Sequence, residues 1–313
     1  METVAQLGEV GLIQRISRRL ARSPSVLVGI GDDAAILRLP RVRHLSRGEL
    51  NGQRYLVFAS DMLVEGVHFR QADLAPRWIG WKALACNISD VAAMGGVPKY
   101  AVVSLGLPPR TPVRFVDGIY AGLAQCARRF GIAIVGGDTV RAPCVVIDVA
   151  IVGFVSPLHL VLRSGARVGD RVFVTGRLGG SLTTKRHATF TPRLREAQWL
   201  VKHLDVHAMI DLSDGLAIDL WHLAWASHVT IRIVERNIPV AQAAKTTRHA
   251  LMDGEDFELL FAVAPSMVSR VPRAIGRLPI SEIGLVSRRG VQVELVRQDG
   301  RITPLAPEGF RHF

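Results

Sequence analysis

The sequence predicts a mixed α/β (α+β) fold in two lobes, and three observations lead to that prediction. Segments of strand and helix type are mixed along the chain without strict β-α-β alternation. The 313 residues are enough for two domains of ordinary size, and 49% of them are hydrophobic. A turn-rich link occupies residues 163–170. We therefore expect an N-terminal sheet-and-helix domain over 1–156 and a C-terminal α/β domain over 157–313.

The N-terminal half contains apolar patterns of both periods. A helix is predicted over 6–22, and a longer one over 75–94 has apolar residues at helical spacing until Gly95 and Gly96 end it. The other elements predicted for this half are strands at 26–30, 55–59, 100–107, 132–136 and 144–155 and a helix at 112–130.

The C-terminal half begins with a strand at 171–175, and a glycine loop, Gly176–Gly180, follows it. Further strands are predicted at 206–210, 229–235, 257–263, 282–286 and 291–297. Helices are predicted at 193–203, 215–227 and 240–251.

Composition and charge narrow the class of protein. Lys and Arg number 39 against 27 Asp and Glu, a net charge of +12, but the basic residues are scattered and not interleaved with aromatics, so we expect a solvated surface and no nucleic-acid partner. Three cysteines without CxxC spacing make neither a disulfide framework nor a zinc site. No apolar run reaches ~18 residues and no signal-peptide pattern is present, so we expect a cytoplasmic protein without membrane contact.

The main functional signal is a set of carboxylates in apolar, glycine-flanked contexts, where an isolated charge is costly. They occur in Gly31-Asp32-Asp33, Ser60-Asp61, Ser89-Asp90, Gly136-Gly137-Asp138, Asp211-Leu212-Ser213-Asp214-Gly215 and Gly254-Glu255-Asp256. We expect each at a strand end, in a turn or near a helix end. Because Mg²⁺ prefers oxygen ligands and bridges carboxylates to phosphates, the set predicts a magnesium-dependent phosphate-transfer site.

Each of these carboxylates also has a structural alternative. Asp32 and Asp33 could form a turn, Asp90 could cap or pair within its helix, and Asp211 and Ser213 could cap helix 215–227. Six such sites in one chain favour a shared role in metal binding. The N–H groups at the start of that helix can also hold phosphate oxygens. No GxxxxGK[ST], HRD or DFG sequence is present, which excludes a Walker-type site and a protein-kinase arrangement.

Histidines give a weaker signal. His68 could contact a substrate phosphate or could be a packed or surface residue. The other histidines, including His187, His203, His207 and His222, are unclustered in the sequence, and we expect them to be structural.

Several blocks together resemble the thiamine-monophosphate kinase family of the aminoimidazole ribonucleotide synthetase-like ATP-binding superfamily. They are GIGDDAA (29–35), SDMLVEGVHF (60–69), KALACNISDVAAMG (82–95), GGDT (136–139), DLSDGL (211–216) and GEDFEL (254–259). The resemblance implies ATP-dependent conversion of thiamine monophosphate to thiamine diphosphate by direct in-line transfer with several Mg²⁺ ions. It also implies a homodimer whose N-terminal sheets pair into a central barrel, with the nucleotide near that interface.

The resemblance also implies roles for individual residues. The implied metal ligands are Asp33, Ser60, Asp61, Asp90, Asp138, Asp211 and Asp214. The implied ATP contacts are Tyr120, Gly137, Asp138, Arg163 and Ser213, and His68 and Glu255 would face the thiamine phosphate. No covalent nucleophile is implied.

The chain departs from the family pattern at three places. Ala59 stands where Ser or Thr often precedes the Ser-Asp pair, and polar and basic residues fill 181–187 where small apolar ones are expected. Pro307 stands where an aromatic is expected to stack on the substrate, so Phe310 or Phe313 would take that place. The alternatives are another ATP-dependent synthetase of the superfamily and a nucleotide-binding protein without kinase activity. A selenophosphate synthetase would need a reactive cysteine in a glycine-rich N-terminal loop, and none is present.

Overall fold

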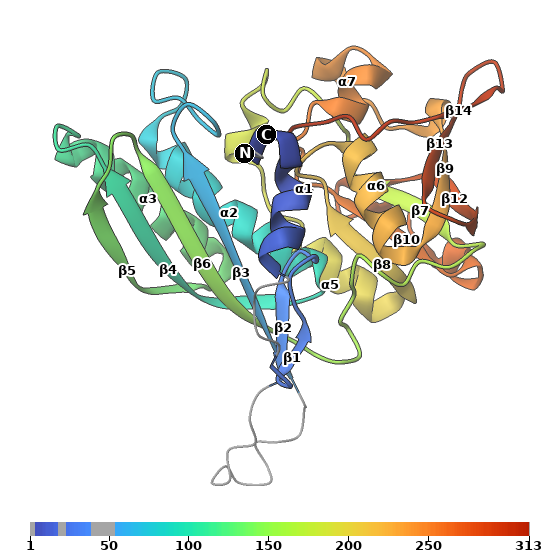
Figure 1. Ribbon diagram of the computed structural model, residues 1–313, viewed down its shortest axis with the longest axis horizontal. Coiled ribbons are helices and arrows are strands. Elements are labelled where there is room, and N and C mark those ends of the chain that lie inside the picture. Colours follow the sequence, from blue (N-terminus) through green and yellow to red (C-terminus); the bar gives the residue numbers. More distant parts are fainter. Residues whose placement is uncertain (1–3, 18–22, 39–53, 313) are drawn as a thin grey trace, which may run out of the picture.

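The computed structural model describes residues 4–17, 23–38 and 54–312. Two sheets stand side by side, each with helices packed against it (Figure 1). Within the described residues the first sheet has six strands and the second has eight, and most strand pairs are antiparallel. The predicted mixed α/β fold is therefore confirmed. In the described part of the chain, no helix is both long and apolar enough to span a membrane.

The first sheet has the strand order β1-β2-β3-β6-β4-β5, in which only the β4–β5 pair is parallel. The elements of this half are α1 (Val4–Ser17), β1 (Val26–Val28), β2 (Ala35–Arg38), β3 (Tyr55–Val64), α2 (Pro76–Ala93), β4 (Val97–Leu107), α3 (Val113–Phe130), β5 (Ala133–Arg141) and β6 (Val146–Val155). Residues 18–22 of the predicted first helix lie outside the described residues.

The second sheet has the order β14-β13-β9-β12-β7-β10-β8, and β11 pairs with β12. Its strands are β7 (Arg171–Thr175), β8 (Val206–Asp211), β9 (Val229–Val234), β10 (Leu259–Val263), β11 (Ala274–Ile275), β12 (Leu278–Arg289), β13 (Gln292–Val296) and β14 (Ile302–Pro304). The helices are α4 (Arg186–Thr189), α5 (Leu194–His203), α6 (Leu216–Ser227) and α7 (Thr247–Met252), with 3₁₀ turns at Glu235–Asn237, Gln242–Ala244 and Pro265–Arg270.

Two strands of the first sheet are longer than predicted, and this changes where the acidic residues lie. β3 pairs with β6 as far as Val64, so Asp61 lies inside a strand and not after one. β5 pairs with β4 as far as Arg141, so Asp138 is also inside a strand. The expectation that every carboxylate marks an element end is wrong for these two residues.

The predicted helix over 240–251 is also wrong. A 3₁₀ turn, Gln242–Ala244, ends at Lys245, whose φ of +64° is incompatible with a continuing helix. A new helix, α7, then begins after Thr246, whose side chain accepts a hydrogen bond from the His249 N–H. Apolar spacing alone did not reveal this break, because the apolar residues keep a helical period across it.

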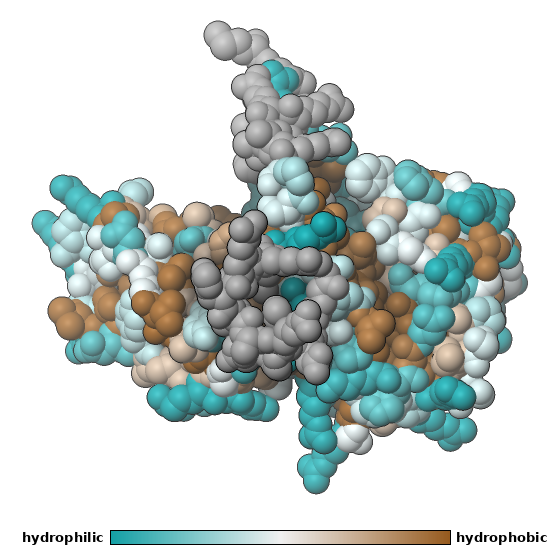
Figure 2. Space-filling view, turned by 90° about the horizontal axis from the view of Figure 1, so that it is seen from below, coloured by the Kyte–Doolittle hydropathy of each residue, from teal (hydrophilic) through white to brown (hydrophobic). Residues whose placement is uncertain are grey.

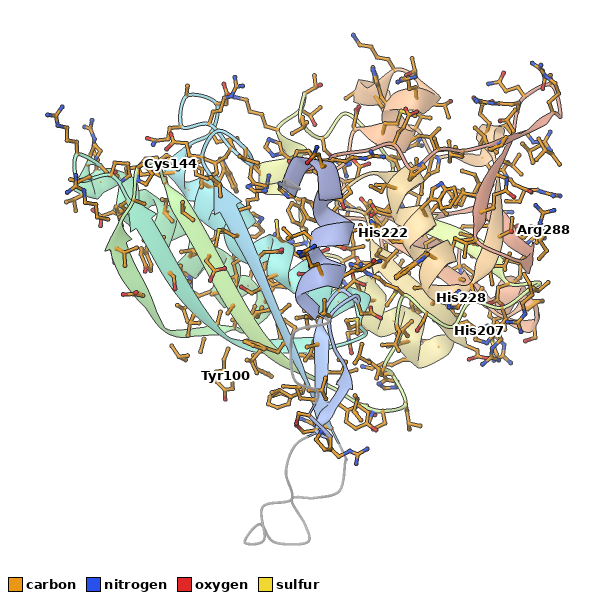
Figure 3. All side chains as sticks on the ribbon, viewed as in Figure 1. Tyr100, Cys144, His207, His222, His228 and Arg288 are labelled. Atoms are coloured by element: carbon orange, nitrogen blue, oxygen red, sulfur yellow. The ribbon has the colours of Figure 1, made fainter. Side chains whose placement is uncertain are left out.

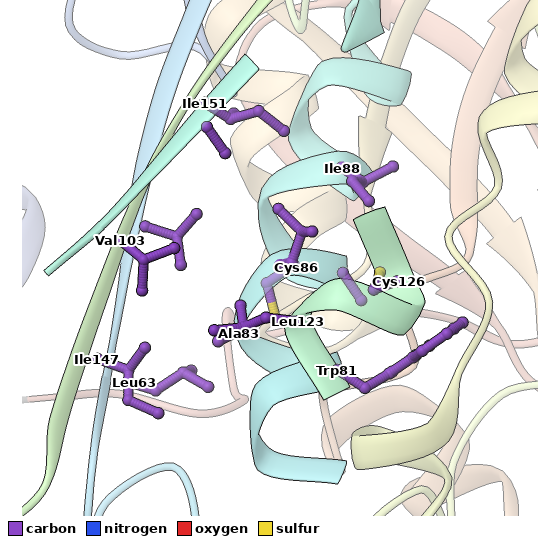
Figure 4. Packing of buried hydrophobic residues seen from close by; sticks show 14 of the residues in the cluster. Leu63, Trp81, Ala83, Cys86, Ile88, Val103, Leu123, Cys126, Ile147 and Ile151 are labelled. Carbon is purple, nitrogen blue, oxygen red and sulfur yellow. The ribbon is translucent and has the colours of Figure 1, made fainter. Parts of the chain in front are cut away.

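Helix α2 is the centre of the first lobe. Pro76 occupies its first turn and Gly95, at φ +69°, follows its end. Fourteen of its 18 residues are buried, because the sheet packs on one side and α3 on another (Figure 4). Gly80 and Gly122 form the α2–α3 crossing: a Cβ at Gly122 would lie 1.8 Å from the Arg77 carbonyl oxygen.

We predict that Gly122→Ala destabilises the protein by about 2 kcal/mol or more, because the added methyl group collides with backbone that cannot move independently. Equilibrium urea unfolding measures the change. Gly29→Ala is the matched control, since its added Cβ would meet only a Val26 methyl group at 3.5 Å. Equal stability of the two variants would contradict the tight α2–α3 crossing.

Candidate metal and phosphate site

Four predicted metal ligands meet between the two sheets, and we call Asp33, Asp61, Asp90 and Asp211 the carboxylate cluster. Asp33 precedes β2, Asp61 lies in β3, Asp90 is in the last turn of α2, and Asp211 ends β8. One oxygen from each of Asp33, Asp90 and Asp211 lies within 4.8 Å of the others. Asp61 shares a side-chain hydrogen bond with Asp90. Residues up to 178 positions apart in the sequence thus form one oxygen-rich site.

Burial and mutual repulsion perturb these carboxyl groups. Burial first, and then the charge of Asp33, raises the pKa of Asp211 to about 8, although the Ser89 hydroxyl donates to Asp211 Oδ2 at 2.6 Å. Burial and the neighbouring Asp61 raise the pKa of Asp90 well above its usual value. Burial likewise raises the pKa of Asp61. Without an added cation, the cluster retains protons near neutral pH.

Arg163 is the cation that contacts the cluster directly. Its Nη2 lies 2.7 Å from Asp33 Oδ1, and its backbone N–H lies 3.3 Å from both carboxylate oxygens of Asp32. Burial, followed by the charge of Asp33, raises the pKa of Asp32 to about 6. In the described part of the chain, one guanidinium therefore pairs with a cluster of several carboxylates, which leaves an excess of negative charge.

Unpaired atoms indicate what would bind at this site. Asp33 Oδ2 and Arg163 Nε are buried and have no hydrogen-bond partner among the described residues. An unpaired carboxylate oxygen among other carboxylates is suited to a divalent cation, and the all-oxygen donor set fits Mg²⁺. An unpaired guanidinium N–H is suited to a phosphate oxygen. The residues present therefore fit both Mg²⁺ and a phosphate group.

Asp214, another predicted ligand, lies in a second group with Asp219 and His222 at the start of α6. One ligating atom of each lies within 4.8 Å of the others. Asp219 Oδ2 accepts from the backbone N–H groups of Asp214 and Gly215, at 3.3 and 3.1 Å. It therefore satisfies backbone groups at the helix start, whereas neither Asp211 nor Ser213 provides a side-chain cap. Burial and then Arg163 lower the pKa of His222, labelled in Figure 3, to about 4, so its ring is neutral.

Ser60 and Asp138 lie apart from the carboxylate cluster. Side chains alternate along a strand, so Ser60 faces the opposite side of the sheet from Asp61, and its hydroxyl donates to Asp148 at 2.9 Å. We call the side of the sheet that carries Ser60 its open face. Asp138 lies on this face too, because Met62, Asp148, Ser104 and Asp138 are paired in turn across β3, β6, β4 and β5. Three strand spacings separate β3 from β5, roughly 14 Å. One metal ion cannot bridge Asp61 and Asp138 within one chain.

The predicted ATP contacts are also divided between locations. Arg163 lies at the carboxylate cluster, and Ser213 is close by between β8 and α6. Gly137 lies in β5, where a Cβ would come within 1.8 Å of the Val103 carbonyl oxygen, so only glycine fits there. Tyr120 is exposed on α3. The polypeptide does not bring Tyr120 or the β5 residues into contact with Arg163.

The predicted substrate residues His68 and Glu255 do come together, through two residues whose role the sequence did not predict. Lys82 Nζ lies 2.5 Å from Glu255 Oε1 and donates to the His68 carbonyl oxygen at 3.0 Å. His187 Nδ1 lies 3.0 Å from Glu255 Oε2. We call these four residues the Lys82 network. His187, which the sequence left unclustered, is therefore clustered with the predicted substrate residues in the fold.

The C-terminal tail reaches the same place. The Phe310 ring lies 6.4 Å from that of His68, and the His312 ring lies 5.1 Å from it. The Phe310 N–H donates to the Asp214 carbonyl oxygen at 2.9 Å, which fixes the tail beside the start of α6. Phe310 is thus next to a predicted substrate residue, and both Phe310 and Pro307 are exposed. Phe313 lies outside the described residues.

Of Lys82 and His187, only Lys82 has a sequence context that could have indicated its role. Lys82 is the only charged residue from 78 to 89, in the middle of an apolar helix, and a lysine there needs buried partners. His187 had no such signal, because its partner Glu255 is 68 positions away. Its proximity depends on how the segment between β7 and α5 folds over the loop that precedes β10.

Known proteins are similar to this chain over almost its whole length. The family model described as AIR synthase related protein, N-terminal domain, matches residues 31–155. Thiamine-monophosphate kinase from Rhodopirellula baltica is 35% identical over 316 residues, covering 97% of each chain. The Bacillus subtilis enzyme of that name is 34% identical, covering 98% of this chain and 100% of the relative.

A solved structure of AaThiL complexed with AMPPCP and TMP has a similar fold. It superposes with a TM-score of 0.82 and 32% identity, covering 100% of this chain and 99% of that one. Sequence and fold are therefore similar over the same span, which includes every described residue of the carboxylate cluster and the Lys82 network. The chain belongs to the thiamine-monophosphate kinase family.

Proposed function

We propose that this protein transfers the γ-phosphoryl group of ATP to the phosphate of thiamine monophosphate, forming thiamine diphosphate and ADP with the help of Mg²⁺. The carboxylate cluster carries the proposal, since its buried carboxylates face a single guanidinium and have an unpaired oxygen, Asp33 Oδ2. The names of the relatives, and the AMPPCP and TMP bound to AaThiL, support the choice of both substrates.

The metal ligands are proposed from geometry. Asp33, Asp61, Asp90 and Asp211 would hold Mg²⁺, and Asp214 would reach a further ion from the start of α6. When bound, Mg²⁺ neutralises the negative charge of the phosphates and so lowers the barrier to transfer. The protein residues keep these oxygens in fixed positions, because each lies on a strand, a buried helix or a segment that Arg163 holds.

The transfer needs little acid–base help from the protein. The terminal phosphate of the acceptor has its second pKa near ~6, so it is already an anionic nucleophile at neutral pH. A direct in-line attack on ATP therefore needs no protein nucleophile and no phosphoenzyme. Arg163 would orient a phosphate oxygen through its unpaired Nε, and the N–H groups at the start of α6 would bind another.

His68 would donate a hydrogen bond to the acceptor. Its Nδ1 accepts from the Val64 N–H at 2.9 Å, so in the neutral ring the proton is on Nε2. Burial, then His312 and Lys82, lower the pKa of His68, which keeps the ring neutral near pH 7. A neutral donor can bind and release a phosphate without a proton transfer. Phe310 would pack beside the thiamine moiety.

We further propose that the active protein is a homodimer in which domain 1–156 pairs through the open face of its sheet. In Figure 1 the strands of this sheet lie in front of α2 and α3, so those helices cover only its rear face. Apolar side chains on the open face are exposed, among them Phe58, Met62, Tyr100 and Val102. Figure 2 also has apolar side chains at the surface of this lobe, and in Figure 3 Tyr100 projects from its sheet.

A second copy is the occupant that best suits this face, because the face is large, continuous across β3, β6, β4 and β5, and apolar at its centre. Asp138 and Ser60 belong to the same face, so their proposed contacts with metal and nucleotide would lie at the subunit boundary. Gly137 and Tyr120 would contribute to the nucleotide site from β5 and α3, while domain 157–313 would supply Asp211, Asp214 and Glu255.

The first prediction from this proposal is that purified protein with ATP, Mg²⁺ and thiamine monophosphate forms thiamine diphosphate and ADP in equal amounts. Chromatographic separation of the thiamine phosphates measures the product. Removal of Mg²⁺ with EDTA should abolish turnover, because the carboxylate cluster alone repels the triphosphate. Intact ATP binding without product would instead support the nucleotide-binding protein without kinase activity.

A second prediction concerns the dimer. Val102→Glu should convert the dimer to monomer, because it places a charge at the centre of the paired sheets, as sedimentation equilibrium can measure. Leu158→Glu is the control, since Leu158 is 90% exposed in a turn outside the sheet. A dimer that persists in the Val102 variant, or a wild-type monomer, would exclude this interface.

A further inference from the structure

We propose that Lys82 is a positioning residue of the acceptor-substrate site, which clamps Glu255 and the His68 segment together and thereby sets the affinity for thiamine monophosphate. This inference rests on the proposed kinase function. It adds a residue that acts through others, since Lys82 is completely buried and its ammonium group donates to the His68 carbonyl oxygen and to Glu255.

The contacts of Lys82 explain why a lysine is buried in an apolar helix. Its Nζ has three neighbours at bonding distance: the His68 carbonyl oxygen at 3.0 Å, Glu255 Oε1 at 2.5 Å and His187 Nδ1 at 3.2 Å. These partners come from three segments: the ammonium group donates to the two oxygens, while His187 Nδ1 lies beside it and hydrogen-bonds Glu255 Oε2 at 3.0 Å. A buried ammonium is tolerated only when it is paired in this way. Lys82 therefore ties α2 to three other parts of the chain.

Glu255 is held from several directions. Its backbone has a φ of +51°, which is rare for a residue other than glycine, and its N–H donates to the Ser213 carbonyl oxygen at 2.6 Å. Although burial opposes ionisation, the His187 hydrogen bond and Lys82 lower the pKa of Glu255. Its side chain is 19% exposed. The carboxylate is thus a fixed acceptor that is partly open to the site.

His187 is kept in place by its own segment. Arg186 lies 2.5 Å from Asp256, and the Phe190 ring stacks on Phe257 with centroids 4.0 Å apart. The Trp81 indole N–H of α2 donates to the Phe190 carbonyl oxygen at 2.7 Å. The polar and basic residues of 181–187, which depart from the family pattern, thus include the side chains that brace Glu255 and the loop after it.

Loss of the Lys82 ammonium group should weaken the binding of thiamine monophosphate more than the binding of ATP. Without the ammonium group, Glu255 loses its hydrogen bond to α2 and keeps a negative charge that faces an anionic substrate phosphate. The carbonyl of His68 loses its donor as well, so both proposed substrate residues lose the contact that joins them to α2. Arg163 and Ser213 do not contact Lys82. Because Asp61 also senses the charge of Lys82, ATP binding has to be measured separately.

The test is Lys82→Met, which keeps the side-chain length but removes the charge. We expect the KM for thiamine monophosphate to rise about ten-fold or more, as for the loss of a charge-assisted hydrogen bond. The kcat and the KM for ATP should stay within about three-fold of wild type. Lys185→Met is the matched control, since Lys185 donates to the Asp73 carbonyl oxygen at the surface and should leave both KM values unchanged.

A double variant separates positioning from general damage. If Lys82 acts largely through Glu255, then the change Lys82→Met should raise the KM for thiamine monophosphate by less than about three-fold in a Glu255→Gln background, clearly less than in the wild-type background. This pair also provides the test if Lys82→Met alone does not fold, because it leaves no buried carboxylate charge without its ammonium partner. Thermal unfolding and ATP titration are recorded for every variant.

Three results would overturn the proposal: an unchanged KM for thiamine monophosphate in Lys82→Met, equal increases in the KM values of both substrates, or additive effects in the double variant. Wild-type turnover in the same assay tests the proposed function separately. If the wild type forms no thiamine diphosphate, the kinase function fails and this inference fails with it. If only the variants behave otherwise than expected, the kinase function stands without a positioning role for Lys82.

Discussion

Repulsion among the buried carboxylates is the constraint on which the rest of this structure depends. Two carboxylate charges within 4.8 Å of each other repel by roughly 3 kcal/mol or more at an effective dielectric constant of about 20. Arg163 offsets part of this repulsion, so the remainder must be relieved by retained protons or by a bound cation. Since folding raises these pKa values, the cation-free protein loses stability as pH rises from about 4 to about 8. The same repulsion is the reason we propose that this site binds Mg²⁺.

Helix α2 connects this site to the fold. This almost entirely buried helix supplies Asp90 to the carboxylate cluster and Ser89, which donates to Asp211. It also supplies Lys82 to the Lys82 network. Its last residues pack into a core formed mainly by the second lobe, with α5 and β10. The glycine contact with α3 fixes its other side. One rigid helix therefore sets the spacing between the proposed metal site and the proposed substrate site.

The sequence predicted the fold class and most elements, and it selected the four acidic residues that meet in the carboxylate cluster, because periodicity and glycine context are local properties. It did not predict that β3 and β5 continue through Asp61 and Asp138, since strand length depends on pairing with β6 and β4. It also could not separate the two faces of the first sheet, which divides Ser60 from Asp61. The pairing of His187 with Glu255 depends on long-range folding that no local pattern records.

The most direct test of the central claim is a calorimetric titration of Mg²⁺ into nucleotide-free protein at pH 6 and pH 8, with Asp211→Asn beside wild type. Because the pKa of Asp211 is raised to about 8 and that of Asp90 is also raised, Mg²⁺ must displace protons. We expect tighter binding at pH 8, proton release at pH 6, and much weaker binding by Asp211→Asn. Binding that is independent of pH and unaffected by the substitution would contradict it.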